Sequence, residues 1–560
     1  MTNAAIYFHP DGYDTTGARL MGRHAAGESF LRGFIRNADV DRLVLYNGTD
    51  KPTSELEPLV QRIEAPAMPI AWIDRRQIGA LRDPGCLYVP SPNIGPEAWA
   101  RQPFDSRRYS LCGVTHTTAT HRVMDILHDL IVGPIEPWDA LICTSRAVRA
   151  SVETQFEAVH DHLARRLGAT RTPQPQLATI PLGVNVADFQ PSEAHRKAWR
   201  DRLGIPADAV VALYLGRLNP IAKMNPATMA ITLEAAARET GRPIYWVVAG
   251  WASSDPETEQ FHAQTRAFCP GIQYRAVDGR PADTRFSIWS VADLFISFSD
   301  NIQETFGLTP AEAMAAGLPC VVSDWDGYRD TVRDGVDGYR IATYAPRPGL
   351  GQDLAFQYAR NWVTYDQYLA AAAQMTAVDL PSAKAAVVAL VTNPDLRRRM
   401  GAAAQQRARS VFDWSAVIPQ YQALWAELAA RRTSALSDPE RRFVDHPNPR
   451  RLDPFALFAG YPTAPMTPES VLSLAPGMTW EAAVARLTPP LASYARWAMP
   501  ASVEIKQTFD QLAVGGSLRV ADITATFSPA RQGIVERSLL RLVKFGILEL
   551  SPLAPVADIS

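Results

Sequence analysis

Two glutamates, Glu304 and Glu312, stand eight residues apart in the segment that follows a short apolar run. Thr309 and Pro310 are typical of a helix start, with Thr309 as the N-cap and Glu312 at the capping-box position. A helix N-terminus presents unpaired backbone N–H groups that favour phosphate. The pattern therefore predicts a site for the charged end of a nucleotide. The spacing alone also allows a structural interpretation, in which Glu312 completes a capping box and Glu304 is a solvated loop acid.

Two cations follow another apolar run, residues 210–215. Arg217 comes directly after Gly216, and Lys223 stands six residues beyond Arg217. The planar guanidinium and the mobile ammonium group both suit phosphate oxygens. The pair predicts a diphosphate site, and a surface arginine and lysine on a loop remain the alternative.

Compact apolar runs of strand length alternate with helical patterns along the first 345 residues. This alternation is typical of parallel sheets with helices on both faces, so the predicted fold class is α/β with two doubly wound sheets. Ligands bind such sheets beyond the carboxyl ends of the strands. The runs are residues 4–8, 43–46, 86–89, 110–114, 139–143 and 177–180 in the first sheet, and residues 210–215, 244–250, 271–274, 293–298 and 318–323 in the second.

Further candidate ligand-binding residues follow these runs. His116 comes just after the fourth run of the first sheet, at the predicted ligand edge, although a lone histidine is often structural. Gly22 and Gly27 belong to a glycine-rich loop after the first run. Glycine there permits close approach of the backbone to a ligand, and a plain flexible loop is the alternative. Gly250 ends the second run of the second sheet at its ligand edge.

Length and composition restrict the class of protein. A chain of 560 residues should form roughly three to four domains. A formal net charge of −2 gives no general attraction to nucleic acid or acidic membranes. Five scattered cysteines argue against a disulfide framework or a zinc site and fit a reducing compartment. The first residues lack a signal sequence, and no apolar run approaches the ~18 residues of a membrane span, so we expect a cytoplasmic protein.

The segment from Glu304 to Ser323 is similar to the E-x7-E segment of retaining glycosyltransferases with the GT-B fold, in particular family 4, the glycosyl transferases group 1. Both acids match, as do Phe306-Gly307 and the Ala-Gly-Leu-Pro turn, and the resemblance extends over residues 4–430. It implies two Rossmann-like domains that face a donor cleft. It also implies a nucleotide-sugar donor, a hydroxyl acceptor, and no cofactor or metal ion.

The resemblance assigns catalytic roles to four residues. It implies that Glu304 contacts the donor sugar, that His116 lies close to that sugar, and that Arg217 and Lys223 bind the donor phosphates. The chain departs from the family after the lysine, where Met224-Asn-Pro replaces the usual glycine. This departure bears on the role assigned to Lys223 more than on the role assigned to Arg217.

The resemblance also implies a larger set of donor-binding positions, which contact the ribose, the base, the diphosphate or the sugar. Glu312 would bind the ribose hydroxyls. Backbone groups at the other positions would hold the base, the diphosphate and the sugar. The set is Glu312, Phe306, Gly307, Leu308, Thr309, Gly216, Gly250, Tyr274, Gly22 and Gly27.

The predicted organisation has five parts. Residues 1–190 form the acceptor-side domain, and residues 205–345 form the nucleotide-sugar domain. Residues 346–430 hold an aromatic insert and the helices that cross back to the first domain, and a proline-rich linker follows at 431–470. Residues 471–560 suggest a small winged-helix-like module. Its last sixty residues carry six Lys/Arg and six Asp/Glu, which favours a protein-contact or dimerisation module over a nucleic-acid binder.

We expect a metal-independent, retaining glycosyltransferase that moves a hexose from a nucleotide-sugar to a hydroxyl group. Two alternatives remain open. One is a phosphorylase or epimerase on the same GT-B scaffold. The other is a regulator that senses a nucleotide-sugar and binds nucleic acid through its C-terminal module.

Overall fold

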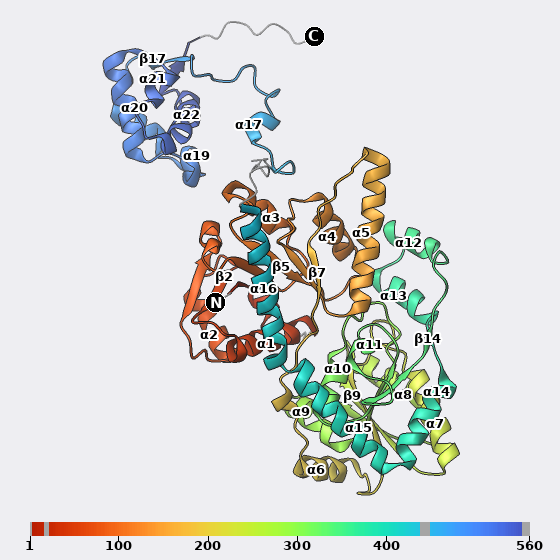
Figure 1. The fold of residues 1–560 in the computed structure, drawn as a ribbon. Helices are drawn as coiled ribbons and strands as arrows, with labels where there is room; N and C mark the ends of the chain where they lie inside the picture. The colour runs from red at the N-terminus through yellow and green to blue at the C-terminus, as the bar shows by residue number, and fades with distance from the viewer. Residues whose placement is uncertain (1–2, 16–21, 437–447, 552–560) are drawn as a thin grey trace. The chain divides into compact units, whose positions relative to one another are not determined.

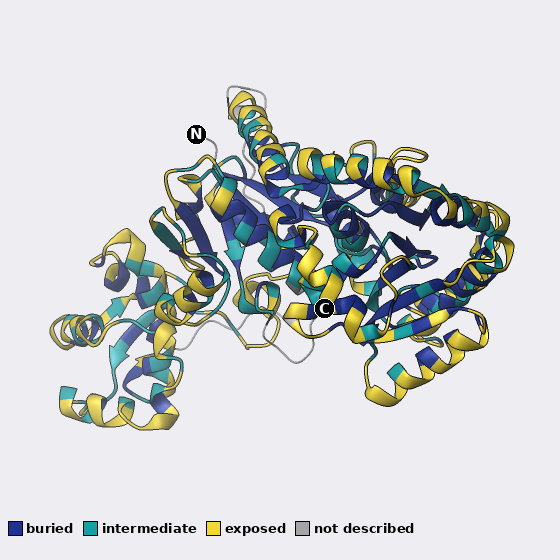
Figure 2. Cartoon of the chain, turned by 90° about the horizontal axis from the view of Figure 1, so that it is seen from below, coloured by how far each residue is buried: buried dark blue, intermediate teal, exposed yellow. Residues whose placement is uncertain are grey.

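The computed structural model describes residues 3–15, 22–436 and 448–551. The chain falls into two compact units, residues 1–446 and residues 447–560. The first unit holds two parallel sheets, and its strands form a buried interior between helices whose outer faces are exposed (Figures 1 and 2). The predicted α/β class with two parallel sheets is confirmed.

The first sheet has seven strands in the order β3-β2-β1-β4-β5-β6-β7, and all neighbouring pairs are parallel. The strand order reverses between β1 and β4, which is where doubly wound sheets open a ligand crevice. Strand β3, with the sequence Ile-Ala-Trp-Ile-Asp, was not predicted and lies half-exposed at one edge of the sheet. The strands are β1 Ala5–Phe8, β2 Leu43–Asn47, β3 Ile70–Asp74, β4 Cys86–Val89, β5 Ser110–Val114, β6 Ala140–Cys143 and β7 Gln176–Thr179.

Helices cover this sheet, and local capping sets several of their ends. Thr120 caps α4 by accepting the N–H of Val123, and Ser145 caps α5 in the same way from Val148. Gly168, in the left-handed conformation, ends α5. The helical segments are η1 Pro10–Gly12, α1 Gly22–Asn37, α2 Thr53–Ile63, η2 Ile78–Arg82, α3 Gly95–Arg101, η3 Gln102–Phe104, α4 His121–Val132 and α5 Arg146–Leu167.

The second sheet repeats this plan with six parallel strands in the order β10-β9-β8-β11-β12-β13. Its order reverses between β8 and β11. The strands are β8 Val210–Arg217, β9 Ile244–Trp251, β10 Gln273–Asp278, β11 Leu294–Ser297, β12 Cys320–Ser323 and β13 Gly338–Ile341. The helices are α7 Pro226–Thr240, α8 Asp255–Ala267, α9 Ala282–Ser287, η5 Ile288–Val291, α10 Leu308–Ala315 and α11 Tyr328–Thr331.

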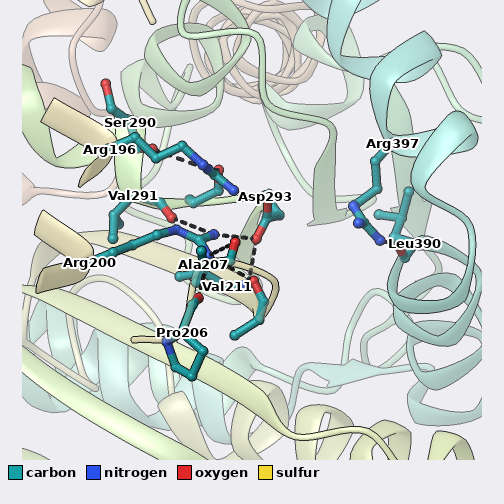
Figure 3. Close-up of polar contacts among 12 residues, drawn as sticks. Arg196, Arg200, Pro206, Ala207, Val211, Ser290, Val291, Asp293, Leu390 and Arg397 are labelled. Atoms are coloured by element: carbon teal, nitrogen blue, oxygen red, sulfur yellow. Dashed lines mark hydrogen bonds and ion pairs between the residues drawn. The ribbon is translucent and has the colours of Figure 1, made fainter. Parts of the chain in front are cut away.

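The connection between the sheets runs through η4, Val186–Phe189, and α6, Glu193–Leu203. A half-buried ion cluster attaches α6 to the second sheet (Figure 3). Asp293 accepts hydrogen bonds from Arg196 at 2.7 Å, from Arg200 at 2.9 Å and from the N–H of Val211 at 2.8 Å. The cluster therefore joins the linker helix to the first strand of the second sheet.

An insertion follows β13. It leaves and rejoins the sheet through the short antiparallel pair of β14, Thr343–Tyr344, and β15, Ala377–Val378. Between them lie two helices, α12 and α13, which span Gln352–Ala359 and Tyr365–Gln374.

The chain then crosses back to the first sheet through α14 Leu380–Thr392, α15 Pro394–Arg407, the π-helical turn η6 Ala408–Phe412, and α16 Trp414–Leu436. Trp414, Tyr421 and Trp425 of α16 are buried in the core of the first sheet. The Trp414 indole N–H donates to Ser29 Oγ at 2.8 Å. Because α16 continues to Leu436, it overlaps the linker predicted to begin at residue 431.

The second unit folds around its own apolar core, in which helices pack on the antiparallel sheet β17-β16-β18. Helices α20, α21 and α22 follow one another in the second half of the unit, and strand β18 comes after them. Strands β16 and β17 were not predicted. The elements are α17 Pro454–Leu457, β16 Val471–Leu474, α18 Trp480–Leu487, α19 Pro490–Ser493, η7 Arg496–Ala498, α20 Ser502–Gly515, β17 Ser517–Arg519, α21 Val520–Thr524, α22 Pro529–Lys544 and β18 Leu548–Leu550.

Candidate functional site

The predicted cations and Glu304 lie at the carboxyl edge of the second sheet, where the strand order reverses. Arg217 is the last residue of β8, and Lys223 lies in the loop that follows it. Glu304 lies in the loop after β11, and this loop ends at α10. Since β8 and β11 are neighbours, the two loops face each other at the switch point of the sheet.

Lys223 and Glu304 form an ion pair, with Lys223 Nζ 3.3 Å from Glu304 Oε2. Burial raises the pKa of Glu304, but the charge of Lys223 and the N–H groups of Thr305 and Phe306 outweigh burial and lower the pKa below its usual range. The carboxylate is therefore ionised at neutral pH. The side chains are 30% and 15% exposed, so the pair is reachable by a ligand.

Hydrogen bonds hold the two loops together beside this ion pair. The Asn301 amide donates to the carbonyl of Ile221. The Gln303 amide donates to the carbonyl of Ala222 at 3.2 Å. The residues that these bonds join stand close to Lys223 on one loop and close to Glu304 on the other. The geometry of the Lys223–Glu304 ion pair therefore depends on the uncharged side chains of Asn301 and Gln303.

Asp300, which the sequence analysis did not single out, forms a third link between the loops. It is 3% exposed, and its Oδ2 accepts the N–H of Asn225 at 3.3 Å. Its Oδ1 is buried and meets no donor among the described residues. Burial raises the pKa of Asp300 to about 7, although backbone N–H groups partly offset this effect.

We expect Asp300→Asn to stabilise the protein increasingly as pH rises. Between pH ~4 and ~7 the folded state keeps the Asp300 proton and the unfolded state does not, so the wild type loses stability as pH rises through this window, by ~1 kcal/mol per pH unit. Asparagine cannot ionise and retains an acceptor for Asn225. Urea unfolding at pH 5, 6, 7 and 8 measures the difference between variant and wild type. The exposed Asp208→Asn serves as control, and a difference that does not grow between pH 5 and 7 would contradict the expectation.

Helix α10 begins two residues earlier than predicted. Its N-cap is Gly307, at φ 79°, and Thr309 therefore lies inside the first turn and makes no cap. The left-handed conformation of Gly307 turns the chain directly after Phe306, and a Cβ at Gly307 would lie 2.0 Å from the ring of Tyr328. The Thr309 hydroxyl instead bonds to the phenol of Tyr328. The capping box of Thr309 and Glu312 is not formed.

The start of α10 nevertheless presents free backbone N–H groups next to the Glu304 loop. Leu308, its first residue, is half-buried, and Phe306 before it is buried in the core of the second sheet. Glu312 is the fifth residue of the helix and half-buried. Burial raises the pKa of Glu312, and the charge of Arg285 partly offsets this.

His116 reaches the same place from the first sheet. It lies two residues beyond β5, and its Nε2 is 3.2 Å from the carbonyl oxygen of Pro90. Its own carbonyl accepts the Thr305 hydroxyl at 2.9 Å. Thr305 follows Glu304 directly, so the structure brings the backbone of His116 next to the loop that carries Glu304.

A second set of bonds between the two sheets involves residues that sequence reasoning missed. Ser145, the cap of α5, donates to Asp326 Oδ1 at 3.2 Å, and Arg146 binds Asp330 through its N–H at 2.7 Å. Burial and the neighbouring charge of Glu304 raise the pKa of Asp326 well above its usual range. A signal existed for Asp326, because it stands next to Gly327 in the loop three residues beyond the carboxyl end of β12.

The predicted glycines fall into two groups. Gly216 and Gly250 face each other at the ends of β8 and β9, and a Cβ on Gly250 would lie 2.0 Å from the Gly216 carbonyl oxygen. Gly27 lies in α1 against η1, where its Cα faces the Gly12 carbonyl. Gly22 begins α1. The first pair lies at the edge that carries Arg217, and the second belongs to the start of the first sheet.

Tyr274 is not brought to the site. Strand β10 begins at Gln273, so Tyr274 stands at its amino end, opposite Trp246, whereas Gly250 pairs with Asp278 at the carboxyl end. The Tyr274 hydroxyl bonds to His262 Nδ1 at 2.6 Å inside the core. The expectation that Tyr274 is a donor-binding position at the ligand edge is therefore corrected, because the strand continues to Asp278, four residues beyond the end of the run 271–274.

The described part of the chain holds no group of three or more His, Cys, Asp or Glu side chains arranged to bind a metal ion. Within the same residues, no helix is both long and apolar enough to cross a lipid bilayer.

Comparison with known proteins associates this site with one family. Residues 195–347 match the family described as glycosyl transferases group 1, and these residues contain Arg217, Lys223, Glu304 and Glu312. D-inositol 3-phosphate glycosyltransferase 2 of Catenulispora acidiphila is 33% identical over 175 residues, or 30% of this chain and 40% of that protein. The enzyme of Xylanimonas cellulosilytica with the name D-inositol 3-phosphate glycosyltransferase is 32% identical over 221 residues, 38% of this chain and 50% of that protein. The chain thus matches half or less of the length of these relatives.

Among solved structures, Anabaena Alr3699/HepE in complex with UDP aligns with a TM-score of 0.49 and 15% identity, covering 76% of this chain and all of that chain. Sucrose-phosphate synthase from Thermosynechococcus elongatus aligns with a TM-score of 0.47 and 17% identity, over 77% of this chain and 100% of that chain.

Proposed function

We propose that this protein is a metal-independent, retaining glycosyltransferase of the GT-B type and of family 4, which transfers a hexose from a nucleotide-sugar to a hydroxyl group. The observation that carries the proposal is the Lys223–Glu304 ion pair beside the N-terminus of α10, at the strand-order reversal of the second sheet. The match of residues 195–347 to the glycosyl transferases group 1 supports it.

The chemistry follows from the charges at this edge. In the transfer, the bond from the anomeric carbon to the diphosphate oxygen breaks, the acceptor hydroxyl oxygen bonds to that carbon, and the hydroxyl proton leaves with the diphosphate. Arg217, Lys223 and the N–H groups at the start of α10 would stabilise the negative charge on the departing diphosphate. Glu304 and His116 would orient the sugar, and Glu312 the ribose. The bonds between the two sheets help to exclude water.

The first test is a thermal-shift measurement on the full-length protein with UDP-, GDP- and ADP-sugars. A ligand that binds only the native state stabilises it by ~2.7 kcal/mol at a hundred times its Kd, so we expect one nucleotide class to raise the Tm by several degrees. Arg217→Ala should abolish the shift. Arg238→Ala removes an exposed arginine that pairs with Glu234 on α7 and should leave the shift unchanged.

If no nucleotide-sugar shifts the Tm, the donor assignment is wrong. Where one does, NMR of the product separates the reaction classes. An α-linked donor that gives an α-linked glycoside indicates retention, whereas release of a sugar phosphate or a changed sugar would indicate a phosphorylase or an epimerase.

For the second unit we propose a winged-helix-like module that contacts protein rather than nucleic acid. Several of its cations are paired with acids of the same unit, since Arg531 pairs with Glu504 at 2.7 Å and Lys506 with Asp510 at 2.6 Å. Arg519 likewise pairs with Asp522 and Glu469. Self-association of the full-length protein in sedimentation would support this role. Salt-dependent binding of DNA would instead favour a nucleic-acid function.

A further inference from the structure

The insertion between β14 and β15 contacts both sheets of the first unit. On the side of the first sheet, the Tyr358 hydroxyl of α12 accepts the N–H of His121 at 3.1 Å. The rings of Tyr358 and His121 stack with centroids 3.6 Å apart, and Tyr368 stacks on Tyr358 at 4.3 Å. Figure 1 shows α12 and α13 beside α5. The insertion is therefore anchored where α4 begins, five residues beyond His116.

On the side of the second sheet, the insertion reaches the loop of Glu304. The Tyr365 hydroxyl donates to Gln303 Oε1 at 3.1 Å, and the Gln303 amide donates in turn to the Ala222 carbonyl at 3.2 Å. A carbonyl can only accept, so the Gln303 amide has one orientation in this chain of bonds. Gln303 directly precedes Glu304, and Ala222 directly precedes Lys223.

Apolar contacts support the same arrangement. Ala119 from the first sheet, Ala222 from the second and Leu369 from the insertion are buried together, with Ile302 and Tyr365 packed against them. This small cluster brings three separate parts of the chain into contact at the site. Burial raises the pKa of Tyr365 to about 12, and bonding to Thr117 and the charge of Arg217 partly offset this, so the hydroxyl keeps its proton at neutral pH.

We propose that Tyr365 is a positioning residue, which holds the Lys223–Glu304 pair in its geometry through Gln303, and that the α12–α13 insertion is a third wall of the site. For its catalytic consequence the proposal rests on the proposed glycosyl transfer. For its structural consequence it rests on the hydrogen bonds and the apolar cluster alone.

The test begins with Tyr365→Phe, which removes one oxygen and keeps the ring. A neutral hydrogen bond contributes about 0.5–1.5 kcal/mol, so we expect kcat for transfer to fall roughly threefold to tenfold, with a smaller change in the KM for the nucleotide-sugar. Tyr368→Phe removes a hydroxyl from the same insertion and should stay within about twofold of wild type.

A double-variant cycle separates positioning from general loss of structure. In the Gln303→Ala background the hydroxyl of Tyr365 has lost its acceptor in the Glu304 loop and keeps only its bond to Thr117, so Tyr365→Phe should have little further effect on kcat. An equal loss of kcat in both backgrounds would overturn the proposal.

A second readout does not need activity. Amide hydrogen exchange of the ligand-free protein should be several-fold faster in Tyr365→Phe than in wild type within residues 219–225 and 300–305, and unchanged in Tyr368→Phe. Unchanged protection of these loops would overturn the proposal even if the protein proves to transfer no sugar. Faster exchange without any transfer by the wild type would retain the positioning role and reject the proposed function.

Discussion

Glu304→Gln is expected to lower kcat for sugar transfer by ~10²–10³-fold while donor binding persists. Glutamine has nearly the same size and keeps one acceptor oxygen, so the fold should be unaffected. The substitution removes the negative charge of the Glu304 carboxylate. Lys223 and two backbone N–H groups keep this carboxylate ionised in the wild type. Glycosyl transfer develops positive charge at the anomeric carbon, and the loss of an adjacent anion raises that barrier.

The measurement is the initial rate with the nucleotide-sugar that the thermal-shift screen selects. The variant should still show the Tm shift, because Arg217 and the start of α10 are unchanged. Glu257→Gln, on the exposed face of α8, is the matched control and should behave as wild type. A Glu304→Gln rate within tenfold of wild type would remove Glu304 from the catalytic set.

The second large effect concerns stability. Asp139→Ala is expected to lower the free energy of unfolding by ~3–5 kcal/mol. Asp139 and Arg101 are both fully buried and form two hydrogen bonds of 2.7 Å. Asp139 also accepts the N–H groups of Leu111 at 2.8 Å and Glu136 at 2.9 Å. Removing the carboxylate leaves the buried guanidinium without a counter-charge and orphans these two donors.

Urea unfolding followed by tryptophan fluorescence measures this loss. The control is Glu153→Gln, which breaks the exposed i,i+4 pair with Arg149 and should cost less than ~0.5 kcal/mol. Replacing both partners, as Arg101→Met with Asp139→Leu, should recover much of the stability because no charge then remains buried. A single Asp139→Ala variant as stable as the Glu153→Gln control would refute this account.

Much of the architecture could be predicted because it depends on local pattern. Strands such as Cys86–Val89 and Leu294–Ser297 are short apolar runs that parallel sheets bury on both faces, and turn residues bound them clearly. Charged residues directly beyond such runs, Arg217 and Glu304 among them, must lie at the carboxyl edge of the sheet. The edge strand Ile70–Asp74 was missed although it is a short apolar run of the same kind.

The sequence by itself determined the fold class and the presence of Lys223, His116 and Glu304 at strand ends, because periodicity and chain order are local properties. Only the tertiary structure decided which side chains meet. Gly307 displaced the predicted cap at Thr309, and the continuation of β10 to Asp278 left Tyr274 at the amino end of the strand, in the core. The bonds of Tyr365 to Gln303 and of Ser145 to Asp326 join residues 62 and 181 positions apart, a separation at which no periodicity carries information.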